Sequence, residues 1–138
     1  MTAYDTNLAS EFFVLSCLHR LGAEASLTLG NKKSVDIFLS KGRRTITIEV
    51  KGVAGPYDWP AENVPKEPRR SHFIVLVSYN GKIGVPEVPP SVWVVPHGEV
   101  NRFIRQYKGR RNISRASVKR DGHAYENAWW RIVGQRST

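Results

Sequence analysis

Residues 34–52, SVDIFLSKGRRTITIEVKG, hold two short runs in which apolar and polar side chains alternate. The apolar positions are Val35, Ile37, Leu39, Ile46, Ile48 and Val50. Alternation with a period of two and a high content of β-branched residues predict two strands, and the short segment 41–44 between them predicts a hairpin. A two-residue loop at Gly42 and Arg43 fits a type II′ turn, which takes Gly at its first central position.

This register separates the side chains into two faces. The six apolar residues share one face and are expected to enter a core, whereas Asp36, Glu49 and Lys51 share the other. Asp36 is expected to lie directly opposite Glu49, with Cβ atoms about 5 Å apart, where like charges destabilise a sheet unless a cation lies between them. Two carboxylates beside a backbone carbonyl suit Mg²⁺ or Mn²⁺. The alternative is the ordinary polar face of a half-exposed hairpin.

The string formed by Asp36, twelve residues and then Glu49-Val50-Lys51 resembles the signature of the PD-(D/E)XK, or restriction-endonuclease-like, nuclease superfamily. A glutamate on the preceding predicted helix, Glu11, belongs to the same pattern. The order and spacing are similar to those of archaeal Holliday junction resolvases. Val35 stands where the superfamily name has Pro, and the resemblance covers residues 5–52.

The resemblance implies an α/β (α+β) domain with a restriction-endonuclease-like core, in which helices flank a mixed central sheet. It implies a Mg²⁺-dependent (or Mn²⁺-dependent) endonuclease that hydrolyses phosphodiester bonds in DNA. Asp36, Glu49 and the Val50 carbonyl would hold the metal ion, Lys51 would orient the attacking water and stabilise the developing charge, and Glu11 would act in the outer shell. No other cofactor is expected.

Three functional interpretations follow. The first is this nuclease, with a structure-specific endonuclease of DNA repair or recombination as the finer expectation; a junction resolvase needs two active sites, which favours a homodimer. The second is a non-catalytic nucleic-acid-binding protein of the same fold, acting as a subunit of a repair, recombination or defence complex. A protein-interaction module without a nucleic-acid role agrees poorly with the charge of the chain.

The net charge of +9 is concentrated at the C-terminal end. Residues 1–100 carry 11 basic and 10 acidic side chains, whereas residues 101–138 carry 10 basic and 2 acidic ones. Such asymmetry indicates a polyanionic partner, with nucleic acid as the expectation and a soluble basic tail as the alternative. The candidate contact residues are Lys32, Lys33, Arg69, Arg70, Lys108, Arg110, Arg111, Arg115, Lys119 and Arg120.

The length of 138 residues fits a single domain, 1–138, with the basic segment 101–138 at its end. No apolar run reaches the ~20 residues of a membrane helix, and no signal peptide is visible. The single cysteine, Cys17, is expected in the core of a protein of the reducing cytoplasm. The four histidines show no metal-ligand spacing, and none is assigned a role.

The rest of the chain predicts elements that support the hairpin. A helix is expected over 6–21, with a buried stripe of Leu8, Phe12, Leu15 and Leu18 and with Glu11 at its edge. Strands are expected over 24–28, over 72–78 with both faces buried, and over 91–95 near a sheet edge. The proline-rich segment 53–71 is expected to be irregular, with Tyr57 and Trp59 either stacked on a base or pinning the loop. A helix over 98–107, a turn-rich segment over 108–123 and a packed element over 127–133 complete the prediction.

Overall fold

The structure is a computed structural model that describes residues 4–28 and 35–134. The helices are α1 (Tyr4–Arg20), α2 (His97–Val100), α3 (Arg115–Asp121) and α4 (Trp130–Val133), with 3₁₀ turns η1 (Asn101–Phe103) and η2 (His123–Tyr125). The strands are β1 (Ala25–Leu27), β2 (Ile37–Lys41), β3 (Arg44–Val53), β4 (Trp59–Pro60), β5 (His72–Ser78), β6 (Ser91–Pro96), β7 (Ile104–Tyr107) and β8 (Arg110–Ile113). These strands form one sheet of five strands and one of three.

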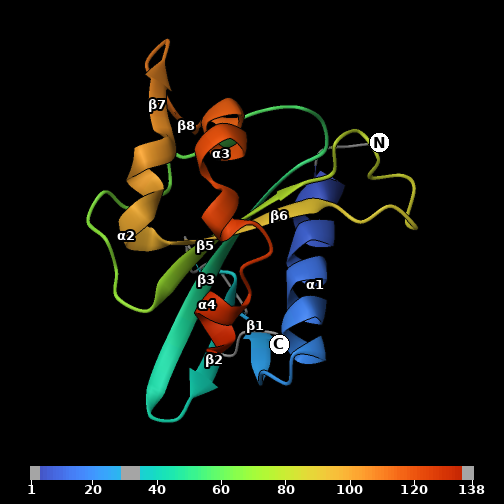
Figure 1. Ribbon diagram of the computed structural model, residues 1–138, viewed down its shortest axis with the longest axis vertical. Helices are drawn as coiled ribbons and strands as arrows, with labels where there is room; N and C mark the ends of the chain where they lie inside the picture. The colour runs from blue at the N-terminus through green and yellow to red at the C-terminus, as the bar shows by residue number, and fades with distance from the viewer. Residues whose placement is uncertain (1–3, 29–34, 135–138) are drawn as a thin grey trace.

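The five-stranded main sheet has the order β1-β2-β3-β5-β6 (Figure 1). The pair β3–β5 is parallel, and the other neighbours are antiparallel, so the sheet is mixed as predicted. The hairpin register is confirmed, because Ile37 pairs with Ile48 and Leu39 with Ile46. Gly42 has a φ of +63°, whereas the φ of Arg43 is not positive, as a type II′ turn requires.

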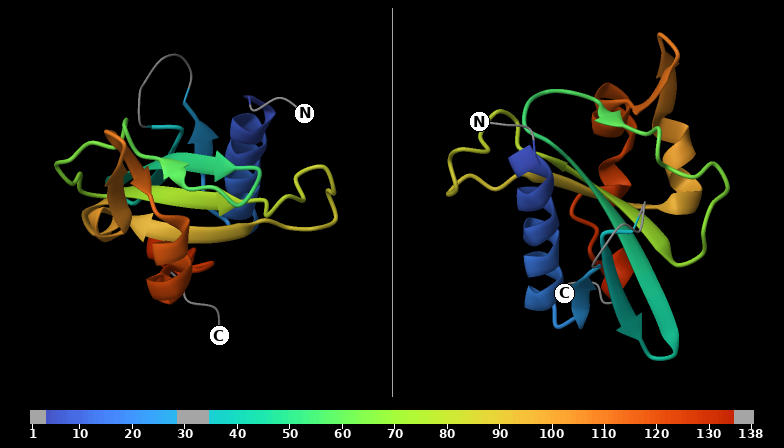
Figure 2. Two further views of the ribbon diagram at one scale, coloured as in Figure 1. Left: turned by 90° about the horizontal axis from the view of Figure 1, so that it is seen from above. Right: turned by 180° about the vertical axis from the view of Figure 1, so that it is seen from behind.

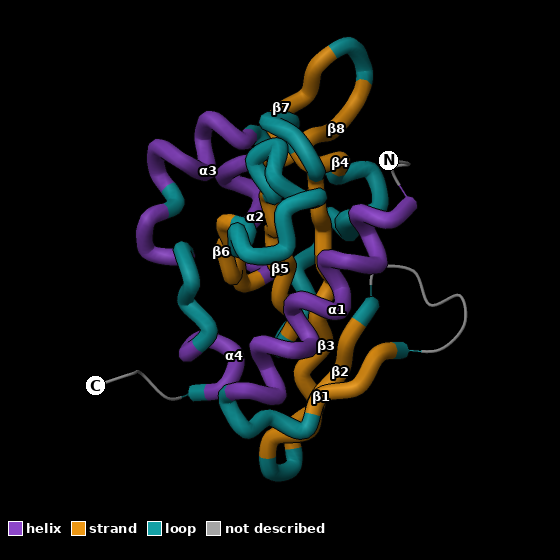
Figure 3. Tube along the Cα trace, turned by 90° about the vertical axis from the view of Figure 1, so that its right-hand side faces the viewer, coloured by secondary structure: helices purple, strands orange, loops and turns teal. Residues whose placement is uncertain are grey.

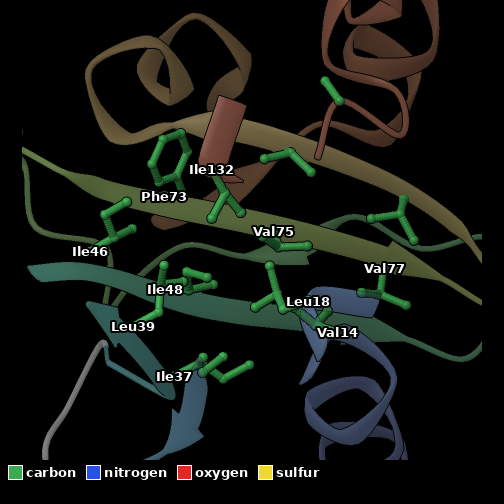
Figure 4. Packing of buried hydrophobic residues seen from close by; sticks show 14 of the residues in the cluster. Val14, Leu18, Ile37, Leu39, Ile46, Ile48, Phe73, Val75, Val77 and Ile132 are labelled. Carbon is green, nitrogen blue, oxygen red and sulfur yellow. The ribbon is translucent and has the colours of Figure 1, made fainter. Parts of the chain in front are cut away.

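Two hydrophobic clusters fill the two faces of the main sheet. Strand β5 is buried along its whole length, with Phe73, Val75 and Val77 in one cluster and Ile74 and Leu76 in the other. The first cluster also contains residues of α1, β2, β3 and α4 (Figure 4). The second cluster joins the sheet to the three-stranded sheet, α2 and α3. The expectation of a mixed central sheet flanked by helices is therefore confirmed.

Helix α1 lies along the first face, beside β1 and β3 (Figures 1 and 2). It ends at Arg20, one residue before the predicted end, and Gly22 follows with a left-handed φ of +84° that stops the helix. The predicted stripe is wrong at two positions, because Leu8 is 54% exposed and Phe12 is 50% exposed. The buried residues are Thr6, Ser10, Val14 and Leu18. Small polar residues lie under the N-terminal half of the helix because α1 approaches β3 closely there: a Cβ on Gly52 would meet Ser10 Oγ at 1.9 Å.

The three-stranded sheet, β4-β8-β7, was not predicted. Residues 104–107 were expected to end a helix, but they pair with Arg110–Ile113 around a turn at Lys108 and Gly109. The prediction failed because strand pairing, which buries Ile113, outweighs the helical spacing of apolar residues in this segment. The segment 108–123, predicted to be turn-rich, likewise contains a strand and a helix, β8 and α3. The packed element predicted over 127–133 is confirmed as α4.

The proline-rich segment contains a short strand as well as loops. Trp59 begins β4, is fully buried, and donates its Nε1–H to the Val77 carbonyl at 3.0 Å. It also meets Trp93 edge to face, with ring centroids 5.7 Å apart. Trp59 therefore pins the loop to the core and is excluded from stacking on a base, whereas Tyr57 is exposed.

No helix among residues 4–28 and 35–134 combines the length and the hydropathy needed to cross a membrane. Cys17 is half-buried on α1, and burial raises the pKa of its thiol.

Candidate active site at the start of β2

Strand β3 presents Glu49 and Lys51 on one face. The Lys51 ammonium lies 3.1 Å from Glu49 Oε2, and the exposed fractions of the two side chains are only 12% and 8%. The other carboxylate oxygen, Glu49 Oε1, is buried and has no hydrogen-bond partner among residues 4–28 and 35–134. Burial raises the pKa of Glu49 above its usual range, while the charge and hydrogen bond of Lys51 act in the opposite direction. The site thus holds a buried carboxylate with one oxygen bound to a cation and one oxygen free.

Asp36 precedes β2 and lies beyond the end of the β2–β3 ladder, whose last pair is Ile37 with Ile48. Its N–H donates to the Ile48 carbonyl at 2.8 Å, and its Oδ2 accepts the Val50 N–H at 2.7 Å. The prediction that Asp36 pairs directly with Glu49 is therefore wrong. The Asp36 carboxylate instead bonds to the β3 backbone at the residue after Glu49, and it still interacts with Glu49 electrostatically.

The same irregularity moves Val35 out of the core. It lies outside the first hydrophobic cluster and lines a groove with the exposed ring of Phe38. The prediction that Val35 shares the apolar face with Ile37 is wrong, because strict alternation ends where the ladder ends.

Glu11 is placed on α1, at the opposite face of the sheet from Glu49. A catalytic Glu11 was expected to need α1 on the polar face of the hairpin, but α1 packs on the apolar face through Val14 and Leu18. Burial and, to a smaller extent, the charge of Asp36 raise the pKa of Glu11. Asp36, at the strand end, interacts with carboxylates from both faces.

Val50 supplies two backbone groups at this point. Its N–H binds Asp36, and the N–H and C=O groups of one strand residue point to the same side of the strand. The Val50 carbonyl is therefore directed toward the side on which Asp36 lies. Asp36, Glu49 and this carbonyl form an all-oxygen set of the kind that Mg²⁺ prefers.

The electrostatics of the site fit a cation. Burial is the main cause that raises the pKa of Glu11, Asp36 and Glu49, and neighbouring carboxylates add to the rise for Glu11 and Glu49. A divalent ion would stabilise the charged forms of these side chains. Among the described residues, no group of three or more His, Cys, Asp or Glu side chains stands close enough to enclose an ion. A Mg²⁺ ion held here would therefore have one or two carboxylate ligands and several waters.

A groove lies on the polar side of the hairpin. It is lined by Thr28, Val35, Phe38, Thr45 and Thr47 and has a volume of about 270 Å³. Thr47 is two residues from Glu49 on β3, so the groove lies along the face on which Glu49 points. Phe38, Thr45 and Thr47 alternate with the apolar positions of the hairpin, but the sequence did not predict the groove.

His97 is a second feature that the sequence did not reveal. Its Nδ1 accepts the Arg69 N–H at 2.9 Å, and its Nε2 lies 2.8 Å from the Pro65 carbonyl, to which it donates. The buried imidazole thus holds both ends of the segment 65–69. His72, beside it at a ring-centroid distance of 5.2 Å, bonds through Nδ1 to Thr47 Oγ1. Contacts between residues 28 to 32 positions apart leave no local signal in a sequence.

The candidate DNA-contact residues fall into three groups. Lys32 and Lys33 lie outside the described residues. The exposed ones are Arg69, Arg70, Lys108, Arg110, Lys119 and Arg120, the last of which pairs with Asp121 at 3.1 Å. The internally bonded ones are Arg111, whose Nη1 donates to the Ala61 and Val64 carbonyls, and Arg115, whose Nη2 donates to Asn80.

The chain matches a solved structure of a bacterial homing endonuclease, I-Ssp6803I, with a TM-score of 0.61 and 14% sequence identity, over 100% of both chains. This protein shares the fold of that endonuclease. At such low identity the likeness concerns the fold alone. No protein-family model matches the sequence, and no curated protein matches it.

Proposed function

We propose that the chain is a metal-dependent nuclease of the PD-(D/E)XK type that hydrolyses phosphodiester bonds in DNA. One observation carries the proposal: Asp36 is bonded to the backbone of Val50, next to a buried Glu49–Lys51 pair in which Glu49 Oε1 has no partner in the described part of the chain. A buried unpaired carboxylate oxygen costs stability, so a binding role is the physical reason to keep it. The fold shared with a bacterial homing endonuclease supports DNA as the substrate.

Asp36, Glu49 and the Val50 carbonyl would hold Mg²⁺ or Mn²⁺, with Glu11 acting through water. The bound ion would lower the pKa of a water molecule and neutralise charge on the scissile phosphate. The residues of the chain position this chemistry, because the Asp36–Val50 hydrogen bond fixes the carboxylate against β3.

Lys51 contributes positive charge to the reaction. Its ammonium has three donors, of which one is used by Glu49 Oε2, so the others are available to the attacking water and to a phosphate oxygen. A preorganised cation stabilises the charge that develops on the phosphate in the transition state. Lys51 would also limit the repulsion between Glu49 and the phosphate.

The test is cleavage of linear duplex, single-stranded and four-way-junction DNA with Mg²⁺, Mn²⁺ or EDTA. We expect cleavage that requires the ion and that falls at least about 100-fold in Asp36→Asn, with Glu62→Gln, an exposed carboxylate, as the matched control. Preference for the junction would support the resolvase-like substrate. DNA that is bound but never cut with either ion would overturn the proposal in favour of a non-catalytic DNA-binding protein.

A titration with Mn²⁺ addresses the metal separately. We expect one ion per chain and weaker binding in Asp36→Asn. Equal Mn²⁺ affinity in Asp36→Asn and the unmodified protein would contradict the assigned ligand.

A further inference from the structure

The β7–β8 hairpin projects from one end of the molecule, opposite the β2–β3 turn (Figures 1 and 3). Its root is held in the core, where Ile113 is fully buried and Ile104 packs against the same cluster. Three further residue pairs lead to the turn at Lys108 and Gly109. At a rise of about 3.3 Å per residue, the tip stands roughly 10 Å beyond this root.

The hairpin is bonded to the rest of the protein through both of its faces, because Arg105 and Arg111 belong to neighbouring pairs of the ladder. Arg111 bonds to the carbonyls of Ala61 and Val64, and Arg105 donates to backbone carbonyls and to Ser117. The ladder also continues into β4, where Ile113 pairs with Trp59. Two-stranded hairpins are marginal alone in water, so these contacts explain how a projecting one stays ordered.

The tip, by contrast, presents unbonded polar and aromatic groups. Tyr107 is 67% exposed and pairs across the hairpin with Arg110, which is also exposed. The Lys108 ammonium lies 5.4 Å from the centre of the Tyr107 ring. Residues 104–113 contain four basic side chains and no acidic one. A tip of this composition suits a polyanion rather than a protein surface.

The backbone of the turn supports a role for the tip. Lys108 and Gly109 have φ values of +53° and +77°, as in a type I′ turn. Asn, Asp or Gly is favoured at the first of these positions, and a lysine there carries conformational strain of about 1 kcal/mol. Because the strained residue is Lys108, the turn carries a cation at the end of the hairpin.

The hairpin and the candidate active site lie on the same side of the main sheet. Glu49 and Lys51 pair in parallel with Ile74 and Leu76, and paired residues of a ladder point to the same face. Ile74 and Leu76 belong to the cluster that contains Ile113 of β8. A duplex that reaches Glu49 on this side would extend along the three-stranded sheet.

We propose that the β7–β8 hairpin enters the major groove of duplex DNA and selects the sequence at which the chain binds. The inference rests on the proposed nuclease function, which it deepens. A two-stranded ribbon fits the major groove, which is about 12 Å wide. Arg110 supplies donors for base edges, particularly guanine, while Lys108 contacts phosphate.

The experiment measures binding without cleavage, using a 30-base-pair duplex library in EDTA at several salt concentrations. The test variant is Lys108→Asn/Arg110→Gln, in which Asn also suits the turn, so lost binding does not arise from a weaker hairpin. The matched control is Arg43→Gln/Arg44→Gln, which removes two exposed charges from the other hairpin turn, at the opposite end of the molecule. Far-UV circular dichroism verifies the fold of both variants.

We expect the Lys108/Arg110 variant to lose at least about 10-fold in affinity near 0.1 M salt. The slope of log affinity against log salt concentration should become shallower by roughly 1, as for one lost phosphate contact. It should also lose base preference at one or two positions of the selected sites, whereas the Arg43/Arg44 variant stays within about 2-fold of the unmodified protein. Equal losses in both variants, unchanged base preference, or no duplex binding by the unmodified protein would overturn the inference. Hairpin-dependent binding without cleavage in Mg²⁺ would overturn the nuclease function while supporting the inference.

Discussion

Glu49 and Lys51 form a charged pair in a site where burial works against charge. We expect Lys51→Ala to abolish cleavage, and the structure adds an effect on stability. Because both side chains are largely buried, removing Lys51 leaves the Glu49 charge uncompensated, and we expect a loss of about 3 kcal/mol in the free energy of unfolding. Urea denaturation of Lys51→Met alone and of Lys51→Met/Glu49→Gln measures this. The double variant should be more stable than Lys51→Met but should still not cleave DNA. Equal stability of the single and double variants would show that Glu49 and Lys51 are not coupled.

Glu11 provides a second prediction, because every cause that acts on its pKa raises it. An acid with a raised folded-state pKa destabilises the fold as the pH rises above its unfolded value, where the charged form must be buried. Glu11→Gln should therefore leave the thermal midpoint in metal-free buffer at pH 7 unchanged or higher, while weakening Mg²⁺ binding and slowing cleavage. Unchanged Mg²⁺ dependence of cleavage would assign Glu11 to the solvated surface.

His72 predicts the pH dependence of stability in the acid range. Burial, His97 and Arg69 lower its pKa from 6.5 to about 4. Between these values the unfolded chain binds a proton that the folded protein does not, so stability falls as the pH drops from 6.5 toward 4, by at most about 3 kcal/mol. Denaturation of the unmodified protein and of His72→Gln at pH 7 and pH 5 isolates this effect from the carboxylates. The same loss on acidification in both proteins would contradict it.

At the scale of elements, the contact between α1 and β3 brings Glu11 near Asp36. Gly52 allows it, since an added Cβ would lie 1.9 Å from the buried Ser10 Oγ. Gly52→Ala should lower stability by about 1–3 kcal/mol and reduce cleavage by displacing α1. Adding Ser10→Gly to this variant should restore stability and cleavage. Gly84→Ala is the control, because no atom lies within 4 Å of its added Cβ. A Gly52→Ala protein that unfolds at the same urea concentration as Gly84→Ala would show that the contact gives way freely.

At the scale of the whole molecule, the two sheets share the second hydrophobic cluster. Trp59 joins them, as it pairs with β8 and bonds to Val77 of β5. We therefore expect residues 1–138 to unfold as one domain, with tryptophan fluorescence and far-UV circular dichroism giving the same urea midpoint and a slope of about 1–3 kcal/mol/M. Separate midpoints for the two probes would divide the chain into two folding units.

The sequence by itself determined the β2–β3 hairpin, its register and turn, the helix before it and the buried strand β5. Each of these follows from local information: alternation with a period of two, a glycine at a turn, or an unbroken apolar run between turns. The same alternation placed Glu49 and Lys51 on one face, where the structure pairs them.

Only the tertiary structure decided how the site is completed. Asp36 leaves the ladder because its carboxylate bonds to the Val50 N–H, and α1 buries Ser10 rather than Leu8 because Gly52 lets the helix approach. The β4–β8–β7 sheet joins segments some 50 residues apart, and its pairing overrides the helical pattern at residues 104–107. Hydrogen bonds and packing between distant segments outweigh local propensity, which differs by only about 1 kcal/mol per residue between the alternatives.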